Sequence, residues 1–192
     1  MAKTLQDIRL QLQRGEVTSE KLVEEALASV KSSEGQGDKT FIKVYDDKAM
    51  VQAKAIDQVR KSGVELHPLA GIPISIKDLF DVAGEITLSG SLVRRKSAPA
   101  KSDAHIVSKL RAAGAILIGR TNMTEFAFSG LGINPHYGTP LNPWDRKTGR
   151  IPGGSSSGAA ISVTDKMAAA AIGTDTGGSV RIPSALCGLT GF

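Results

Sequence analysis

The first sixty residues carry apolar side chains at the spacing of amphipathic helices. A short first helix is predicted by apolar residues three or four positions apart, Leu5, Ile8 and Leu12. Gly15 is placed to end this helix. Thr18 is suited to cap a second helix, whose apolar stripe comprises Leu22, Val23, Ala26, Leu27 and Val30. The polar residues 32–39 break the pattern, so we expect a loop there.

Beyond residue 40, strand-like and helix-like segments alternate. Strands are predicted at 41–45, 72–76 and 115–118. Helices are predicted from Asp46 to just before Gly63 and from 103 to 113. A long loop is expected between the strand at 72–76 and about residue 101. Such alternation indicates an α/β fold, an α/β/α sandwich around a mixed, largely parallel twisted sheet. No repeat or linker divides the chain, so one domain is expected.

Composition excludes several classes of protein. The chain has 192 residues, 41% of them hydrophobic and 22% charged, which is typical of a soluble globular domain. Its net charge of +5 is scattered apart from one basic run at 94–96, so direct nucleic-acid binding is not expected. The single Cys187 fits a reducing compartment. Without a leader-like or membrane-spanning apolar run, we expect a cytoplasmic protein with no membrane association, metal or cofactor.

Lys77 ends an apolar strand and is a candidate base. With a period of two residues, Ile72, Ile74 and Ile76 share one face, while Ser75 and Lys77 share the other. A lysine stripped of water can accept a proton from a nucleophile. Taken alone, the pattern favours an ordinary lysine that is solvated or paired with its neighbour Asp78.

The turn at 153–158 (Gly-Gly-Ser-Ser-Ser-Gly) has three interpretations. A flexible linker is one, although the apolar residues 159–163 that follow it look like a buried helix. A phosphate-binding loop is the second, and it lacks the required lysine because Ala159 stands there. The third is a nucleophile elbow, yet no strand precedes the turn and every histidine lies upstream of it, at 67, 105 and 136. A Ser-His-Asp hydrolase is therefore not expected.

A second turn is the sharper signal. The small apolar run 167–172 is expected to form a buried strand, and the chain then leaves it abruptly through two glycines to Ser179. A serine in that position is well placed to attack a carbonyl, although a purely structural turn has the same composition. Arg181 is expected to pair with Asp175 and brace the turn. The two turns and Lys77 together indicate acyl-transfer chemistry without histidine.

Three motifs in order resemble the amidase signature family. They are residues 71–78 (Gly-Ile-Pro-Ile-Ser-Ile-Lys-Asp), 152–158 (Pro-Gly-Gly-Ser-Ser-Ser-Gly) and 173–183 (Gly-Thr-Asp-Thr-Gly-Gly-Ser-Val-Arg-Ile-Pro). The resemblance extends over essentially the whole chain and implies the sandwich fold of that family. It also implies a Ser-cisSer-Lys triad of Ser179, Ser155 and Lys77, with a cis Gly154–Ser155 peptide bond. Ser157 stands where the family often has glycine.

The resemblance assigns further roles around this triad. Backbone N–H groups of Thr176, Gly177 and Gly178 would bind the oxyanion. Ser129 and Thr174 would line the acyl pocket, and the residues that support the site without touching substrate would be Ser156, Asp175 and Arg181. Ser179 would attack an amide carbonyl while Ser155 passes its proton to neutral Lys77. For Lys77 to be neutral near pH 7, its pKa must fall by roughly three units from about 10.4.

The implied activity is hydrolysis of a small-molecule amide through an acyl-serine, releasing ammonia or an amine. One alternative is a glutamine-dependent amidotransferase subunit that acts on misacylated tRNA, but Ile182 stands where that branch often carries glutamine. Another is a catalytically inert scaffold or binding subunit. Both alternatives predict the same fold.

Family members normally continue for more than another hundred residues beyond this point. We therefore expect residues 1–192 to be the N-terminal portion of a single domain, with a helical segment at about 1–63 and a catalytic core segment at about 64–192. The portion alone should be catalytically poor. A partner chain or homodimer is expected to complete the fold.

Overall fold

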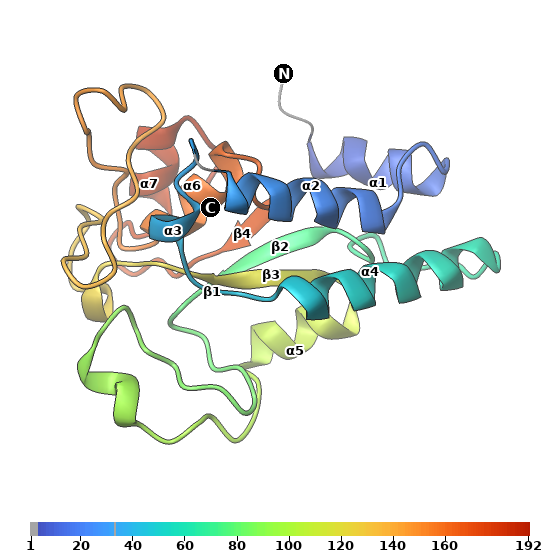
Figure 1. Ribbon diagram of the computed structural model, residues 1–192, viewed down its shortest axis with the longest axis horizontal. Helices are drawn as coiled ribbons and strands as arrows, with labels where there is room; N and C mark the ends of the chain where they lie inside the picture. The colour runs from blue at the N-terminus through green and yellow to red at the C-terminus, as the bar shows by residue number, and fades with distance from the viewer. Residues whose placement is uncertain (1–3, 33) are drawn as a thin grey trace.

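The computed structural model describes residues 4–32 and 34–192, which form a four-stranded sheet with helices on both faces (Figure 1). The helices are α1 Leu5–Gln13, α2 Ser19–Lys31, α3 Gly37–Thr40, α4 Asp46–Lys61, α5 His105–Ala112, α6 Ser157–Thr164 and α7 Arg181–Cys187, with 3-10 turns at Val93–Lys96 and Glu125–Ala127. The strands are β1 Phe41–Val44, β2 Pro73–Lys77, β3 Ile116–Thr121 and β4 Ala170–Ile172. Over the described ranges, no helix is long and apolar enough to span a membrane.

The N-terminal helices begin where their caps place them. Thr4 and Asp7 form a capping box at the start of α1. At the start of α2, the Thr18 hydroxyl accepts a hydrogen bond from the Lys21 N–H at 3.1 Å. The expected loop at 32–39 differs from the structure, because α3 begins within it. The N–H groups of Lys39 and Thr40 both donate to the Gln36 carbonyl, forming a single turn too short to give an apolar period.

The sheet is mixed, as predicted. Its strand order is β1-β3-β2-β4, with β2 parallel to both β3 and β4 and with β1 antiparallel to β3. In this register Lys77 lies opposite Thr121, and Ile76 lies opposite Ile172. The carboxyl ends of the three parallel strands therefore meet at one edge of the sheet, where ligand sites of α/β folds form.

The two faces of β2 have the chemistry that its alternation predicts. Ile72, Ile74 and Ile76 belong to one buried cluster with Val107 and Leu110 of α5. On the other face, Ser75 Oγ lies 2.8 Å from Ser162 Oγ of α6, and β3 packs against α2 and α4. Figure 1 shows α5 on one side of the sheet and α2 and α6 on the other. Lys77 consequently points to the face that carries α6.

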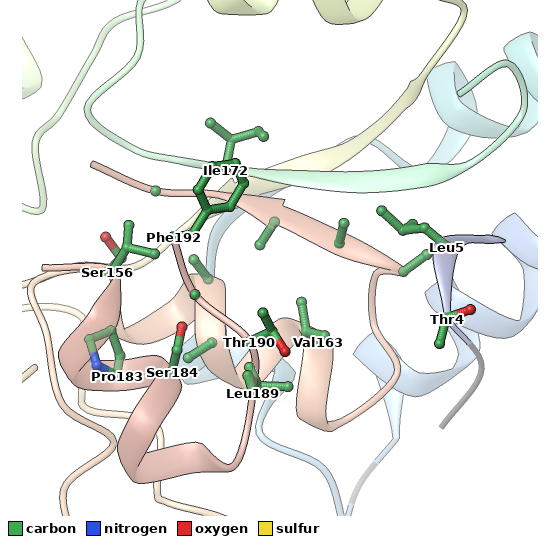
Figure 2. Close-up of a pocket in the computed structure, with 18 residues that line it drawn as sticks. Thr4, Leu5, Ser156, Val163, Ile172, Pro183, Ser184, Leu189, Thr190 and Phe192 are labelled. Atoms are coloured by element: carbon green, nitrogen blue, oxygen red, sulfur yellow. The ribbon is translucent and has the colours of Figure 1, made fainter. Parts of the chain in front are cut away.

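The fourth strand is shorter and less buried than expected. It comprises only residues 170–172 of the apolar run 167–172, and it pairs on one side only, with β2. Its side chains are half-buried because a groove of about 550 Å³ lies beside it (Figure 2). The groove is lined by α6, α7, β4 and the last residues of the chain, including Val163, Ile172, Leu189 and Phe192. The β4 edge of the sheet is thus open and apolar.

Gly158 allows α6 to approach the end of β3. A Cβ at this position would lie 2.5 Å from the Thr40 carbonyl oxygen and 2.7 Å from both the N and O atoms of Asn122. These are backbone atoms that cannot rotate away. We expect Gly158→Ala to lower the free energy of unfolding by about 1–3 kcal/mol, measured by urea denaturation. Helix propensity alone predicts a gain of about 1 kcal/mol, so an unchanged or increased stability would contradict this packing.

Candidate active site

Lys77 lies at the end of β2 and is completely buried. Its Nζ donates hydrogen bonds to Ser155 Oγ at 2.6 Å and to Thr174 Oγ1 at 2.7 Å. Lys77 is neither solvated nor bonded to its neighbour Asp78, so the two structural interpretations of this lysine do not describe it. The amine instead joins the two glycine-rich turns.

Asp78 is bound by Arg120 of β3. The Arg120 Nε–H donates to Asp78 Oδ1 at 2.8 Å, and the Gly90 N–H donates to Asp78 Oδ2 at 3.1 Å. Neither side chain is more than 2% exposed. Arg120 Nη2 also donates to the Phe80 carbonyl at 2.9 Å. This buried pair fixes the loop that leaves β2 immediately after Lys77.

The first turn is a buried and fully packed segment. Residues 153–160 are all buried. The Gly154 N–H donates to the Gly130 carbonyl at 2.7 Å, and the Thr124 N–H donates to the Ser155 carbonyl at 3.1 Å. The Gly154–Ser155 peptide bond is cis, as the resemblance implies. The interpretation of this turn as a flexible linker is therefore wrong, because α6 begins within it at Ser157.

The second turn is organised by one carboxylate. Asp175 accepts backbone N–H groups from Gly178 at 2.7 Å, Val180 at 3.0 Å and Arg181 at 3.1 Å. The Arg181 side chain adds a fork of two hydrogen bonds, at 3.0 Å from Nε and 2.7 Å from Nη2. The expected pairing of Arg181 with Asp175 is thus present.

Ser156 links the two turns. Its N–H donates to the Ser179 carbonyl at 3.2 Å, and its Oγ lies 3.4 Å from both the N and O atoms of Thr174. Ser179 is half-buried, and its hydroxyl has no hydrogen bond to any described residue. The structure therefore joins Lys77 and Ser155 directly and holds the Ser179 backbone one residue from Ser155. The nucleophilic role of Ser179 stays a prediction.

The three expected oxyanion donors are not equivalent. Thr176 and Gly177 lie on the exposed tip of the second turn, and their N–H groups are not engaged by the described part of the chain. The Gly178 N–H differs, because it donates to Asp175 Oδ1 at 2.7 Å and is not free to bind an oxyanion in this structure. Sequence reasoning missed this bond, since it depends on how the carboxylate folds back over its own turn.

The two expected pocket residues lie in different surroundings. Thr174 contacts Lys77 Nζ, so its hydroxyl is placed to orient the amine. Ser129 lies on the segment against the first turn, where its Oγ accepts the Leu131 N–H at 3.2 Å and its neighbour Gly130 binds Gly154. Ser129 thus borders the site.

Burial lowers the pKa of Lys77 to about 8, and the negative charge of Asp175 opposes this shift. The fall is smaller than the three units that full neutrality at pH 7 requires. The side-chain bonds from Arg181, followed by its backbone N–H, hold the pKa of Asp175 well below its usual range. Lys77 therefore titrates near physiological pH, whereas Asp175 stays an anion at every pH in that range.

Two asparagines that sequence reasoning did not single out position the loops of the site. Asn134 Nδ2 donates to the carbonyls of Gly90 and Met123, both at 2.8 Å. Asn122 Nδ2 donates to Lys39 at 2.9 Å and Gly138 at 2.8 Å. Their signal in the sequence is weak, because a buried asparagine in a loop has no period. Among the residues that the structure describes, no cluster of three or more acidic, histidine or cysteine side chains is suited to hold a metal ion.

Comparison with known proteins identifies the class to which this fold and site belong. The family model described as Amidase matches residues 21–192. The chain belongs to the amidase family.

Individual relatives come from more than one branch of this family. The chain is 42% identical over 178 residues to AtzE, the 1-carboxybiuret hydrolase subunit of Pseudomonas sp. (strain ADP), covering 93% of this chain and 38% of the relative. It is 42% identical over 190 residues to a glutamyl-tRNA(Gln) amidotransferase subunit from Chromohalobacter salexigens, covering 99% of this chain and 38% of that protein.

Solved structures agree with this assignment. One is an inhibitor-bound structure of a vestigial protein complex, described as revealing the evolutionary origins of an s-triazine catabolic enzyme. It superposes on this chain with a TM-score of 0.90 at 40% identity, and the match covers 97% of this chain and 40% of that one. The peptide amidase of Stenotrophomonas maltophilia superposes with a TM-score of 0.83 at 34% identity, and the match covers 96% of this chain and 38% of that one. The chain therefore spans about two fifths of the length of the relatives that it matches.

Proposed function

We propose that this protein hydrolyses carboxylic amides through an acyl-serine intermediate formed on Ser179. The observation that carries the proposal is the 2.6 Å hydrogen bond between the buried Lys77 Nζ and Ser155 Oγ, beside the backbone of Ser179. A serine attacks an amide efficiently only when a base removes its proton, and the described part of the chain has no histidine bonded to either serine. Lys77, with its lowered pKa, is the base that this site offers.

The proton path follows from these contacts. Ser179 Oγ adds to the amide carbonyl carbon and gives its proton to Ser155 Oγ, whose own proton passes to Lys77 Nζ. The negative charge on the carbonyl oxygen is received by the N–H groups of Thr176 and Gly177. The tetrahedral intermediate then expels the amine, which takes the proton back through Ser155. Water cleaves the resulting ester by the same relay in reverse and frees Ser179.

A second candidate function is the transfer of glutamine-derived ammonia by an amidotransferase subunit. The 42% identity to a glutamyl-tRNA(Gln) amidotransferase protein supports it. Ile182, where that branch often carries glutamine, favours the amidase. A panel of aliphatic, aromatic and carboxylated amides with ammonia detection separates the two. If glutamine is included among the carboxylated amides and is the one amide that is hydrolysed, the result would favour the amidotransferase.

The open edge of β4 is where we place the expected partner. The groove beside β4 is apolar, and β4 has an unpaired edge that accepts another strand. We propose that polypeptide equivalent to the unmatched three fifths of the relatives covers this groove. Polypeptide in the groove would shield from water the face of the sheet that carries α6, which is the face to which Lys77 points.

A serine-directed probe tests the proposed nucleophile. Incubation of the purified full-length protein with a fluorophosphonate is expected to give one adduct, located on Ser179 by mass spectrometry. Ser179→Ala should abolish the adduct, because the hydroxyl that forms the covalent bond is gone. Labelling of Ser155 in its place would reassign the nucleophile. A full-length protein that stays unlabelled and hydrolyses no amide would instead support the inert scaffold.

A further inference from the structure

Two residues adjacent in the chain to Lys77 or to its contact Thr174 carry carboxylates, and each carboxylate is bound by its own arginine. Asp78 follows Lys77 directly in the chain and is bonded to Arg120. Asp175 follows Thr174, whose hydroxyl receives a hydrogen bond from Lys77 Nζ, and is bonded to Arg181. Each of the two carboxylates is therefore part of an ion pair rather than an isolated anion.

The charge of Asp175 matters more to Lys77 than that of Asp78. Asp175 is the acidic group that favours the ammonium form of Lys77, in opposition to burial. The Asp78 side chain, by contrast, is directed away from that of Lys77 and towards Arg120 by the alternation along the strand. The Arg120 side chain is in turn shared with Glu85, at 3.6 Å. The hydroxyls of Ser155 and Thr174 complete the polar surroundings of the amine.

Asp175 would remain an anion without Arg181. Three backbone N–H groups also donate to its oxygens, and hydrogen bonds of this kind stabilise a carboxylate. Removal of the guanidinium would consequently leave a negative charge near Lys77 with no cation beside it. An uncompensated carboxylate stabilises a nearby ammonium, so the amine would hold its proton to higher pH.

We propose that Arg181 is a positioning residue that favours the uncharged form of Lys77 by offsetting part of the charge of Asp175. This inference rests on the proposed function, in which the uncharged amine is the base. It gives the arginine a role beyond bracing the second turn. A brace holds the backbone, whereas a counter-charge sets the proton affinity of a different side chain.

The titration of Lys77 is the decisive measurement, because it does not depend on turnover. In protein labelled with ¹³C at lysine Cε, the Lys77 signal is assigned by its absence in Lys77→Met and followed from pH 6 to 11. Arg181→Gln is expected to move its midpoint upward by about one unit. Arg181→Lys retains the positive charge without the fork and should restore most of the wild-type midpoint. Arg14→Gln, which removes a guanidinium from an exposed pair with Glu16, should leave the midpoint unchanged.

Other outcomes separate this inference from a purely structural role. If Arg181→Gln lowers the melting temperature while Lys77 titrates at the wild-type midpoint, the proposal is wrong. Should Arg181→Gln fail to fold, Asp175→Asn offers the opposite test, since loss of the anion should lower the Lys77 midpoint. An unshifted midpoint in that variant would also overturn the proposal. Failure of Ser179 to react with the fluorophosphonate would count against the hydrolase alone, because the Lys77 titration does not involve Ser179.

Discussion

Replacing Lys77 by methionine is expected to lower kcat/KM for amide hydrolysis by about 10²–10⁴-fold, the usual contribution of a general base. Methionine retains a long, unbranched side chain in the buried space and cannot accept the proton of Ser155. Steady-state ammonia release by the purified full-length protein and its variant measures the loss. Lys109→Met is the matched control, because Lys109 lies exposed on α5 and should tolerate the same change without effect.

The pH dependence of kcat/KM distinguishes the loss of a catalytic base from a loss of folded structure. With a pKa of about 8, the Lys77 amine becomes uncharged as pH rises through that value, so kcat/KM of the wild type should rise with pH and level off above it. Near pH 7 only about a tenth of the amine is uncharged. Lys77→Met should lack this rise at any level of residual activity. A variant that keeps the wild-type profile would show that another group accepts the proton.

The position of Lys77 on one face of β2 could be predicted from the sequence, because the alternation that indicates it lies within a single strand. Alternation along β2 put the three isoleucines on one face and Lys77 on the other, and the structure confirms both faces. The Thr18 cap is similarly local, since its partner Lys21 is three residues away. Local patterns of this kind depend on one element alone, so no knowledge of its neighbours was needed.

Features that depend on distant partners could not be predicted in the same way. Arg120 and Asp78 are separated by 42 positions, and an arginine within an apolar strand gives no hint of its partner. The exposure of β4 depends on what lies beside the sheet, which the apolar run 167–172 does not reveal. The engagement of Gly178 with Asp175 depends on the exact path of a turn. In each case tertiary packing, rather than residue type, decides the outcome.

Replacing Arg120 by methionine is expected to lower the free energy of unfolding by about 3–5 kcal/mol, because it leaves Asp78 buried without its counter-charge. The Asp78 carboxylate would keep its bond from the Gly90 N–H, while the Phe80 carbonyl would lose the Arg120 donor. Urea denaturation at pH 7 measures the effect. Arg150→Met is the matched control, since its pair with Asp145 is largely exposed and should contribute less than about 1 kcal/mol.

The pH dependence of this loss identifies its cause. Burial raises the pKa of Asp78, and Arg120 opposes that rise. Without Arg120 the folded state should bind a proton at Asp78 more readily than the unfolded state does, so the deficit of the variant should shrink as pH falls. Asp78→Asn combined with Arg120→Met removes the isolated charge and should recover part of the stability at pH 7. If the single variant is no less stable than Arg150→Met, the Asp78–Arg120 pair does not hold the strand end beside Lys77.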